Sequence, residues 1–218
     1  MNIKGAIFDM DGTLLESLGV WEPVWDAVGD ACGCPGFRPR EEDVMAAQTM
    51  LWTDIMHLLR KNYFPTVPSQ TLIDAILNAV TVFYEEQVTL KPGVLEFLEH
   101  LKARGVKMCI ASASEPQIIE LALRHCGITD YFCGLISCQD VGKGKESPEV
   151  FLAALKLLGT APEDTCLFED SYVSICTGAS IGLQTVGIYD QYNFCHEEMA
   201  RTAQHSVGPG ETLKKLLV

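Results

Sequence analysis

The stretch Ile3-Lys4-Gly5-Ala6-Ile7-Phe8, followed by Asp9-Met10-Asp11-Gly12-Thr13, decides the fold of this chain. A short apolar run leads two aspartates, spaced i and i+2, into a Gly-Thr turn. Residues i and i+2 of an extended strand point to the same side, and open α/β sheets build their sites at the carboxyl ends of strands. The segment therefore predicts a buried strand that carries Asp9 and Asp11 side by side at its end.

The aspartate pair also suggests a chemistry. Two adjacent anions repel each other unless a metal ion or a proton holds them together. An aspartate can also attack phosphorus and form an aspartyl-phosphate. The alternative is a strand followed by an ordinary Asp-Gly turn. Segments further along the chain favour the first interpretation.

Composition limits the classes of function. Of the 218 residues, 48% are hydrophobic, which is enough for one sizeable core, alone or with a smaller accessory domain. The net charge of −13 disfavours binding to nucleic acid or to an anionic membrane. It allows a phosphate substrate, because a local site can be positive within an acidic protein.

The nine cysteines are irregularly spaced, and Cys32-Gly33-Cys34 lacks the second ligand pair of a zinc site. Cys109 and Cys166 lie in apolar runs, where cysteine acts as a small hydrophobe. The sequence begins without a charged n-region and a hydrophobic h-region, and no apolar run is long enough to span a membrane. We therefore expect reduced thiols and a cytoplasmic protein. We also expect a monomer or a weak homodimer.

Residues 16–90 are rich in helical periodicity and poor in strand signals, and Pro35-Gly36, Pro65 and Pro68 separate the helices. Apolar residues recur at helical spacing in three stripes: Trp21, Val24, Trp25 and Val28; Ile55, Leu58 and Leu59; and Leu72, Ile73, Ile76, Leu77 and Val80. We interpret the stripes as the core of a helical bundle. The alternative is a substrate pocket lined by four large side chains, those of Trp21, Trp25, Met45 and Trp52.

From Lys91 onward, strands alternate with helices. Strands are expected over 106–111, 134–137, 165–168 and 184–188, and helices from Val94 toward Gly105 and over 115–126, 147–158 and 171–181. Alternation of this kind predicts parallel βαβ units. The first strand must join the same sheet, because an isolated strand cannot satisfy its backbone. The expected fold is an α/β, Rossmann-like parallel sheet core of residues 1–15 and 91–218, with residues 16–90 inserted as a helical domain.

Three more polar segments follow predicted strands. In Ala111-Ser112-Ala113-Ser114, small residues let backbone N–H groups approach an anion, a serine hydroxyl can donate to it, and a helix N-terminus follows. The alternative is a capping turn that uses Ser114. The segment 142–148 carries Lys143 and Lys145 before a helix that starts at a proline. Either lysine can reach a phosphoryl group as a point charge, or both can be solvated.

The last segment is Glu169-Asp170-Ser171. Its carboxylates suit Mg²⁺, which takes oxygen ligands. The alternative is a helix cap by Asp170 or Ser171. All four polar segments follow strands of one predicted parallel sheet, whose carboxyl ends converge on one crevice. This convergence favours function over four unrelated turns.

Together these motifs resemble the haloacid dehalogenase superfamily. The matching residues are Asp9-Met10-Asp11-Gly12-Thr13, Ile110-Ala111-Ser112, Lys145 with Pro148 and Phe151, and Glu169-Asp170. Their order and spacing agree with the family over essentially the whole chain. Residues 16–90 are similar to the four-helix cap of the β-phosphoglucomutase and phosphoglycolate phosphatase branch.

The resemblance implies roles for these residues. Asp9 would be the nucleophile, and Asp11 would protonate the leaving oxygen and then activate water. Mg²⁺ would be bound by the Asp9 carboxylate, the Asp11 main-chain carbonyl and Asp170, with help from Glu169. Phosphoryl oxygens would be held by four residues: Gly12, Ser112, Ala113 and Lys145.

Departures from the family patterns narrow the expected activity. In β-phosphoglucomutases a histidine follows the first motif, and the corresponding position here falls at about Trp21. The segment Glu16-Ser17-Leu18-Gly19-Val20 also differs from the usual Asp-Ser/Thr pattern. Phosphonoacetaldehyde hydrolases use a cap lysine, and the only one here is Lys61, next to Arg60. We therefore expect an Mg²⁺-dependent phosphatase of a small phosphorylated metabolite. The alternatives are a sugar phosphomutase and a non-catalytic binding or regulatory protein.

Overall fold

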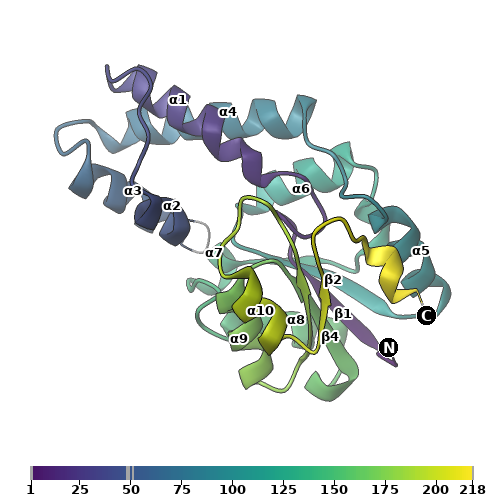
Figure 1. Ribbon diagram of the computed structural model, residues 1–218. Coiled ribbons are helices and arrows are strands. Elements are labelled where there is room, and N and C mark those ends of the chain that lie inside the picture. The colour runs from purple at the N-terminus through teal and green to yellow at the C-terminus, as the bar shows by residue number, and fades with distance from the viewer. Residues whose placement is uncertain (1, 48–49, 51, 218) are drawn as a thin grey trace.

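The structure is a computed structural model that describes residues 2–47, 50 and 52–217, without the side chains of Trp52 and Thr53. Six strands form one parallel sheet in the order β3-β2-β1-β4-β5-β6 (Figure 1). The strands are β1 (Gly5–Phe8), β2 (Lys107–Ser112), β3 (Leu135–Ser137), β4 (Thr165–Glu169), β5 (Gln184–Ile188) and β6 (His205–Val207). The predicted α/β fold with a parallel sheet is confirmed.

Strand β1 lies between β2 and β4, in the middle of the sheet. Its last residue, Phe8, is in register with Ile110 of β2 and Phe168 of β4. The backbone N–H of Asp9 donates to the carbonyl of Phe168 at 3.0 Å. Asp9 therefore leaves the sheet between the carboxyl ends of two neighbouring strands, where ligands bind in sheets of this kind.

Helices cover both faces of the sheet. Outside residues 16–90 they are α5 (Val94–Ala103), α6 (Pro116–His125), α7 (Cys138–Val141), α8 (Glu149–Leu158), α9 (Tyr172–Ser180) and α10 (His196–Thr202), with short 3₁₀ turns η2 (Thr129–Tyr131), η3 (Pro162–Asp164) and η4 (Leu213–Leu216). Helices α8 and α9 pack on one face, and α5 and α6 cover the other.

The side chains of successive residues of β1 point to opposite faces of the sheet. Ile7 packs with Phe151 of α8 on one face. Phe8 points to the opposite face, where it stacks on Phe168 with 4.5 Å between ring centroids and meets the edge of Phe97 at 6.3 Å. Because both faces are buried, the central strands are continuous hydrophobic runs rather than alternating ones.

Residues 16–90, here called the helical segment, contain η1 (Leu18–Val20), α1 (Trp21–Ala31), α2 (Glu41–Ala47), α3 (Trp52–Asn62) and α4 (Ser69–Glu86). Figure 1 shows these helices gathered at one end of the molecule, with α1 and α4 running alongside each other. The chain enters this segment and leaves it again through two connections that are hydrogen-bonded to each other. The N–H of Glu16 donates to the carbonyl of Thr89 at 2.9 Å, and that of Lys91 to Leu14 at 2.8 Å.

Most of the expected elements are present, with ends that differ by a few residues. The apolar stripes of the helical segment are buried or pack against the core, as interpreted, apart from Leu77, which is 38% exposed. Leu95, in the stripe expected from Val94, is 42% exposed. Each of these two residues faces solvent because a helix with one covered face leaves its outer side in water.

Although the resemblance implied a fourth helix in residues 16–90, four short elements apart from the 3₁₀ turns have no counterpart in the sequence patterns: α2, α7, α10 and β6. Each is seven residues or fewer, so none offers enough residues for a periodic pattern to appear. Helix α7 is held instead by a capping box, in which the Ser137 hydroxyl accepts from the N–H of Gln139 and the Asp140 carboxylate accepts from the N–H of Ser137. The strand at 184–188 is consequently not the last of the sheet, since β6 pairs with it.

Candidate active site

A cavity lies where the carboxyl ends of β1, β2 and β4 meet the helical segment. Its free volume is about 80 Å³, which exceeds the space of a single water several-fold. Seven of the eight predicted site residues line it: Asp9, Asp11, Ser112, Ala113, Lys145, Glu169 and Asp170. The polar segments of the sequence therefore converge on one place, as expected.

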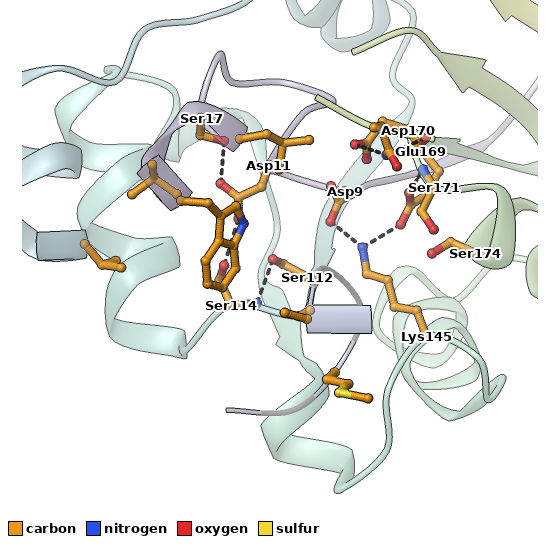
Figure 2. Close-up of a pocket in the computed structure, with 18 of the residues that line it drawn as sticks. Asp9, Asp11, Ser17, Ser112, Ser114, Lys145, Glu169, Asp170, Ser171 and Ser174 are labelled. Carbon is orange, nitrogen blue, oxygen red and sulfur yellow. Dashed lines mark hydrogen bonds and ion pairs between the residues drawn. The ribbon is translucent and has the colours of Figure 1, made fainter. Parts of the chain in front are cut away.

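The buried centre of the cavity is a lysine between two carboxylates (Figure 2). The Lys145 amine forms ion pairs with Asp9 and with Glu169, the second at 2.5 Å. The three side chains are 4% exposed (Lys145), 7% (Asp9) and 1% (Glu169). Burial opposes the charge of the amine, but the two anions prevail and raise the pKa of Lys145. The amine is therefore a permanent positive charge beside Asp9.

This contact decides between the two lysines of the segment 142–148. Lys145 is buried in the cavity, whereas Lys143 is exposed. Glu169 also accepts a hydrogen bond from the N–H of Ser171 at 2.8 Å, through the oxygen that does not contact the lysine. Both oxygens of Glu169 are therefore engaged, and the carboxylate fixes the position of the amine.

Asp170 is held by polar groups from two other loops. Its carboxylate accepts hydrogen bonds from the Thr13 hydroxyl at 3.2 Å and from the Asn193 side-chain amide at 2.7 Å. The same amide donates to the Asp170 main-chain carbonyl at 2.8 Å. Ser171 is the N-cap residue of α9, but its side chain makes no capping hydrogen bond. The alternative, a cap of this helix by the side chain of Asp170 or Ser171, is therefore wrong.

Gly12 lies beneath the cavity rather than on its wall. Its φ is +78°, and a Cβ atom there would fall 2.3 Å from a carboxylate oxygen of Asp170. Only glycine combines that backbone conformation with this close approach. The Asp-Gly of the first motif is thus a turn that brings Asp9 and Asp170 together.

Asp11 lies in the same cavity but in a different environment. Figure 2 shows its carboxylate directed away from Asp9, toward Ser17 and Ser114. One oxygen accepts from the Ser17 hydroxyl at 2.6 Å and from the phenol of Tyr84, and the other accepts from the Ser114 hydroxyl at 2.7 Å. The two aspartates therefore lie in one cavity after the end of β1, as predicted, but their carboxylates point in different directions.

Tyr84 brings the helical segment into contact with Asp11. Burial, and then the nearby Asp11 carboxylate, raises the pKa of the phenol well above its usual value. The phenol therefore stays protonated and donates its hydrogen bond. Sequence reasoning missed Tyr84, since it lies 73 positions from Asp11 in a helix whose apolar stripe explained its neighbours.

The loop after β2 has a different role from the alternative considered for it. Helix α6 has Glu115 as its N-cap and no side-chain cap, so Ser114 is not a capping residue. The Ser112 hydroxyl accepts from the N–H of Ser114 at 3.1 Å, which closes a tight turn. Ser112 is buried and Ala113 is half-buried, and both face the cavity.

Of the four large side chains proposed as a pocket, only Trp21 is found to line the cavity. Trp25 is buried behind it, with the two ring systems stacked 4.9 Å apart. Met45 is 39% exposed and outside the lining, and the Trp52 side chain is outside the described part of the structure. Asn193 and Ser174 also line the cavity and were missed, because neither belongs to a motif that stands out in the sequence.

The acidic residues fit a divalent cation. Asp9, Glu169 and Asp170 each offer a carboxylate oxygen, and these oxygens lie within 4.8 Å of one another. Burial, and then the surrounding negative charge, raises the pKa of both Asp9 and Asp170, although Lys145 acts in the opposite direction. Three carboxylates beside one amine favour an additional cation, and oxygen donors match the preference of Mg²⁺ and similar ions.

Comparison with known proteins agrees with the sequence and the site. A curated relative, protein CbbY of Rhodobacter capsulatus, is 29% identical over 88% of each chain. The phosphorylated carbohydrates phosphatase of Thermotoga maritima is 26% identical over 98% of each chain, and hexitol phosphatase A of Escherichia coli is 24% identical over 86% of this chain and 84% of its own.

Solved structures support the fold. CbbY from Rhodobacter sphaeroides in complex with phosphate has a TM-score of 0.81 at 23% identity, and covers 94% of this chain and 93% of its own. A family described as haloacid dehalogenase-like hydrolase matches residues 3–182, which include every predicted site residue. The chain therefore belongs to the haloacid dehalogenase-like hydrolases.

Proposed function

We propose that this hydrolase is an Mg²⁺-dependent phosphatase that hydrolyses a small phosphorylated metabolite through an aspartyl-phosphate on Asp9. The observation that carries the proposal is the buried Asp9 carboxylate beside the permanent charge of Lys145, with a second aspartate in the same cavity. The names of the relatives, which include phosphatases of phosphorylated carbohydrates and hexitols, support this reaction class.

Asp9 is the proposed nucleophile. Its carboxylate attacks phosphorus, the bond from phosphorus to the ester oxygen breaks, and the alcohol leaves. Mg²⁺, held by the carboxylates of Asp9 and Asp170, the main-chain carbonyl of Asp11 and the assisting Glu169, would neutralise charge on the phosphoryl group. Lys145 supplies a second positive charge, which Glu169 keeps in position.

The remaining phosphoryl oxygens are assigned to the turn after β2 and to the first motif. The Ser112 hydroxyl and the N–H of Ala113 donate from one side, and the backbone around Gly12 closes the other. Ser112 and Ala113 belong to a tight turn, and Gly12 lies in a second turn where a side chain would meet Asp170. These donors are therefore fixed before substrate arrives, which is the condition for electrostatic stabilisation of a transition state.

Asp11 is proposed as the acid that protonates the leaving oxygen and as the base that then activates water. In this structure it accepts hydrogen bonds from three hydroxyl groups. Ser114 comes from the core, whereas Tyr84 comes from α4 of the helical segment. Asp11 must exchange some of these bonds for the substrate oxygen, so movement of the helical segment would accompany the proton transfer.

We also propose that the helical segment, residues 16–90, is a cap domain on a core of residues 1–15 and 91–218. The chain enters and leaves the segment through two connections that are hydrogen-bonded to each other, and side chains of the segment form one wall of the cavity. A cap of this kind admits substrate when open and excludes water when closed.

Product analysis in isotopically labelled water tests the function. Hydrolysis predicts that label enters inorganic phosphate in step with substrate loss, in a reaction that needs Mg²⁺. Formation of an isomeric phosphate ester without free phosphate would instead identify a phosphomutase. Absence of turnover with a broad set of phosphomonoesters would favour a binding or regulatory protein.

A further inference from the structure

The wall that the helical segment contributes to the cavity is apolar. Its lining side chains include Leu18, Val20, Trp21, Ile55 and Val80. Trp21 is half-buried and the other four are at most 8% exposed. The alcohol part of a phosphate ester bound to Asp9 must meet this wall, because the opposite side of the cavity is taken by the phosphoryl-binding groups.

The two hydroxyl groups described on that wall already have a partner. The hydroxyl groups of Ser17 and Tyr84 both donate hydrogen bonds to the Asp11 carboxylate. Turning these hydroxyl groups toward a ligand would cost free energy, because the Asp11 carboxylate would lose charge-assisted hydrogen bonds. A polyhydroxylated alcohol would therefore bury hydroxyl groups against the described part of this wall without compensation.

Cations are absent from the described part of the wall. The helical segment contains five basic residues: Arg38, Arg40, His57, Arg60 and Lys61. None of them lines the cavity. Arg38 and Arg40 form ion pairs with acidic residues of their own segment, and the other three lie around a separate depression on α3.

A second phosphate would thus meet no positive charge on the helical side. On the core side the amine of Lys145 is held between Asp9 and Glu169, and it is the sole basic residue lining the described cavity. Burying an anion without a cationic or hydrogen-bonding partner is strongly unfavourable. The cavity therefore discriminates against a bisphosphate.

Trp21 gives the wall a flat and rigid surface. Its ring system stacks on that of Trp25 at 4.9 Å and 21° between planes, and Trp25 is 4% exposed. A ring supported from behind keeps its plane, so it offers a fixed apolar face to a ligand.

We infer that the substrate is the monophosphate ester of a small, uncharged and largely apolar alcohol, rather than a bisphosphate or a polyol phosphate. Trp21 is the residue that sets this preference. The inference rests on the proposed phosphatase activity and specifies its substrate class, which differs from the carbohydrates and hexitols in the names of the relatives.

The test uses three esters of equal carbon chain: butyl phosphate, butanediol bisphosphate and erythritol phosphate. They differ only in the groups that would meet the helical wall. We expect kcat/KM for butyl phosphate to exceed that for each of the other two by about tenfold or more, as is usual when a buried polar group finds no partner. An equal or higher value for the bisphosphate or the polyol ester would overturn the inference.

Two variants link the preference to the wall. Trp21→Ala should lower kcat/KM for butyl phosphate by about tenfold, while Leu152→Ala, at a side chain 48% exposed on α8, should change nothing. Trp21→Arg should raise kcat/KM for the bisphosphate relative to kcat/KM for butyl phosphate. If both Trp21 variants fail to fold, the comparison of the three esters on the unaltered protein still decides.

A binding measurement separates this inference from the proposed function. Calorimetry with Asp9→Asn and the three esters reports the preference of the wall without turnover. If butyl phosphate binds most tightly but the unaltered protein turns over none of the esters, the substrate preference is supported and the proposed phosphatase activity is rejected. If the unaltered protein turns over the esters but all three bind equally well, the substrate preference is rejected and the phosphatase activity is supported.

Discussion

The two sides of the cavity treat charge in opposite ways. On the sheet side, Asp9, Lys145, Glu169 and Asp170 are all buried, and the single amine offsets only part of the negative charge of the three carboxylates. On the side of the helical segment, the lining is apolar and Asp11 is surrounded by neutral hydroxyl groups. The difference indicates a division of labour, in which the sheet provides the charge that phosphoryl transfer needs and the helices select the alcohol.

The same contrast extends to the rest of the helical segment. Its described charged residues are exposed except for Asp43, which is 7% exposed and lies away from the cavity. Asp43 accepts hydrogen bonds from Arg40, Asn62 and the phenol of Tyr63. Buried charge on the sheet side is thus proposed to act in catalysis, while in the helical segment it joins α2 to the end of α3.

The largest expected effect follows from removing the nucleophile. Asp9→Asn should lower kcat by roughly four orders of magnitude or more, because the carboxylate of Asp9 forms the covalent intermediate in the proposed mechanism. The measurement is phosphate release at saturating substrate. Circular dichroism should show an unchanged fold, since asparagine keeps the size of the side chain. Substantial residual turnover would remove Asp9 from the mechanism.

Removal of the cation should have a comparable effect. The three clustered carboxylates hold an excess of negative charge, so a phosphate dianion should not approach them without a divalent ion. We expect chelation to eliminate turnover and added Mg²⁺ to restore it. Full activity after exhaustive chelation would contradict the assignment of Asp9 and Asp170 as ligands.

Loss of the buried amine should have the next largest effect. Lys145→Met should lower kcat/KM by about 10²- to 10³-fold, the usual effect of removing one group that stabilises transition-state charge. It also leaves Asp9 and Glu169 without their partner, which should change stability. Lys143→Met is the matched control, because that lysine is exposed, and it should change neither property. Equal effects of the two variants would refute the assignment.

Tyr84→Phe should have a smaller effect that depends on the leaving group. The variant removes one of three hydrogen bonds to Asp11, so we expect about a tenfold loss of kcat with alkyl phosphates, which need an acid to protonate the leaving oxygen. Aryl phosphates with good leaving groups should be affected less. Tyr131→Phe, on the far η2 turn, is the control. A uniform loss across all esters would favour a purely structural role for Tyr84.

The sheet side of the site was predictable from sequence, and the helical side was not. Asp9, Ser112, Lys145 and Glu169-Asp170 each follow or adjoin a strand of one parallel sheet, and strand order alone brings such positions together. The approach of Tyr84 to Asp11 depends on how α4 packs over the core. Periodicity places a residue on a helix face but does not say where that face docks.

Asn193 illustrates a second limit. It binds the Asp170 carboxylate at 2.7 Å from a loop between β5 and α10, a region in which the sequence predicted no further element. Short elements such as β6, which pairs with β5, and α10, which packs on α9, form because tertiary structure offers a partner, not because their own sequences require it. A residue positioned by such an element carries no local signal.

The smallest expected effect on turnover follows from substitution of Asp43, the buried charged residue of the helical segment. The hydrogen bond from Tyr63, together with Arg40, lowers the pKa of the Asp43 carboxyl. A carboxyl with a depressed pKa stabilises the fold above its unfolded pKa of about 3.9, and that contribution is lost as the pH falls through the lower folded value. Asp43→Asn should therefore lower the free energy of unfolding by about 1 to 2 kcal/mol at neutral pH, and by less in acid.

Denaturant unfolding at several pH values measures the effect, and kcat with saturating substrate should stay unchanged because Asp43 does not line the cavity. Asp26→Asn is the matched control. Its carboxylate also pairs with an arginine, Arg38, at 2.7 Å, but is 55% exposed, so its loss should be close to neutral. If Asp43→Asn lowered kcat without lowering stability, the charge of the helical segment would act in catalysis, and the division between the two sides of the cavity would fail.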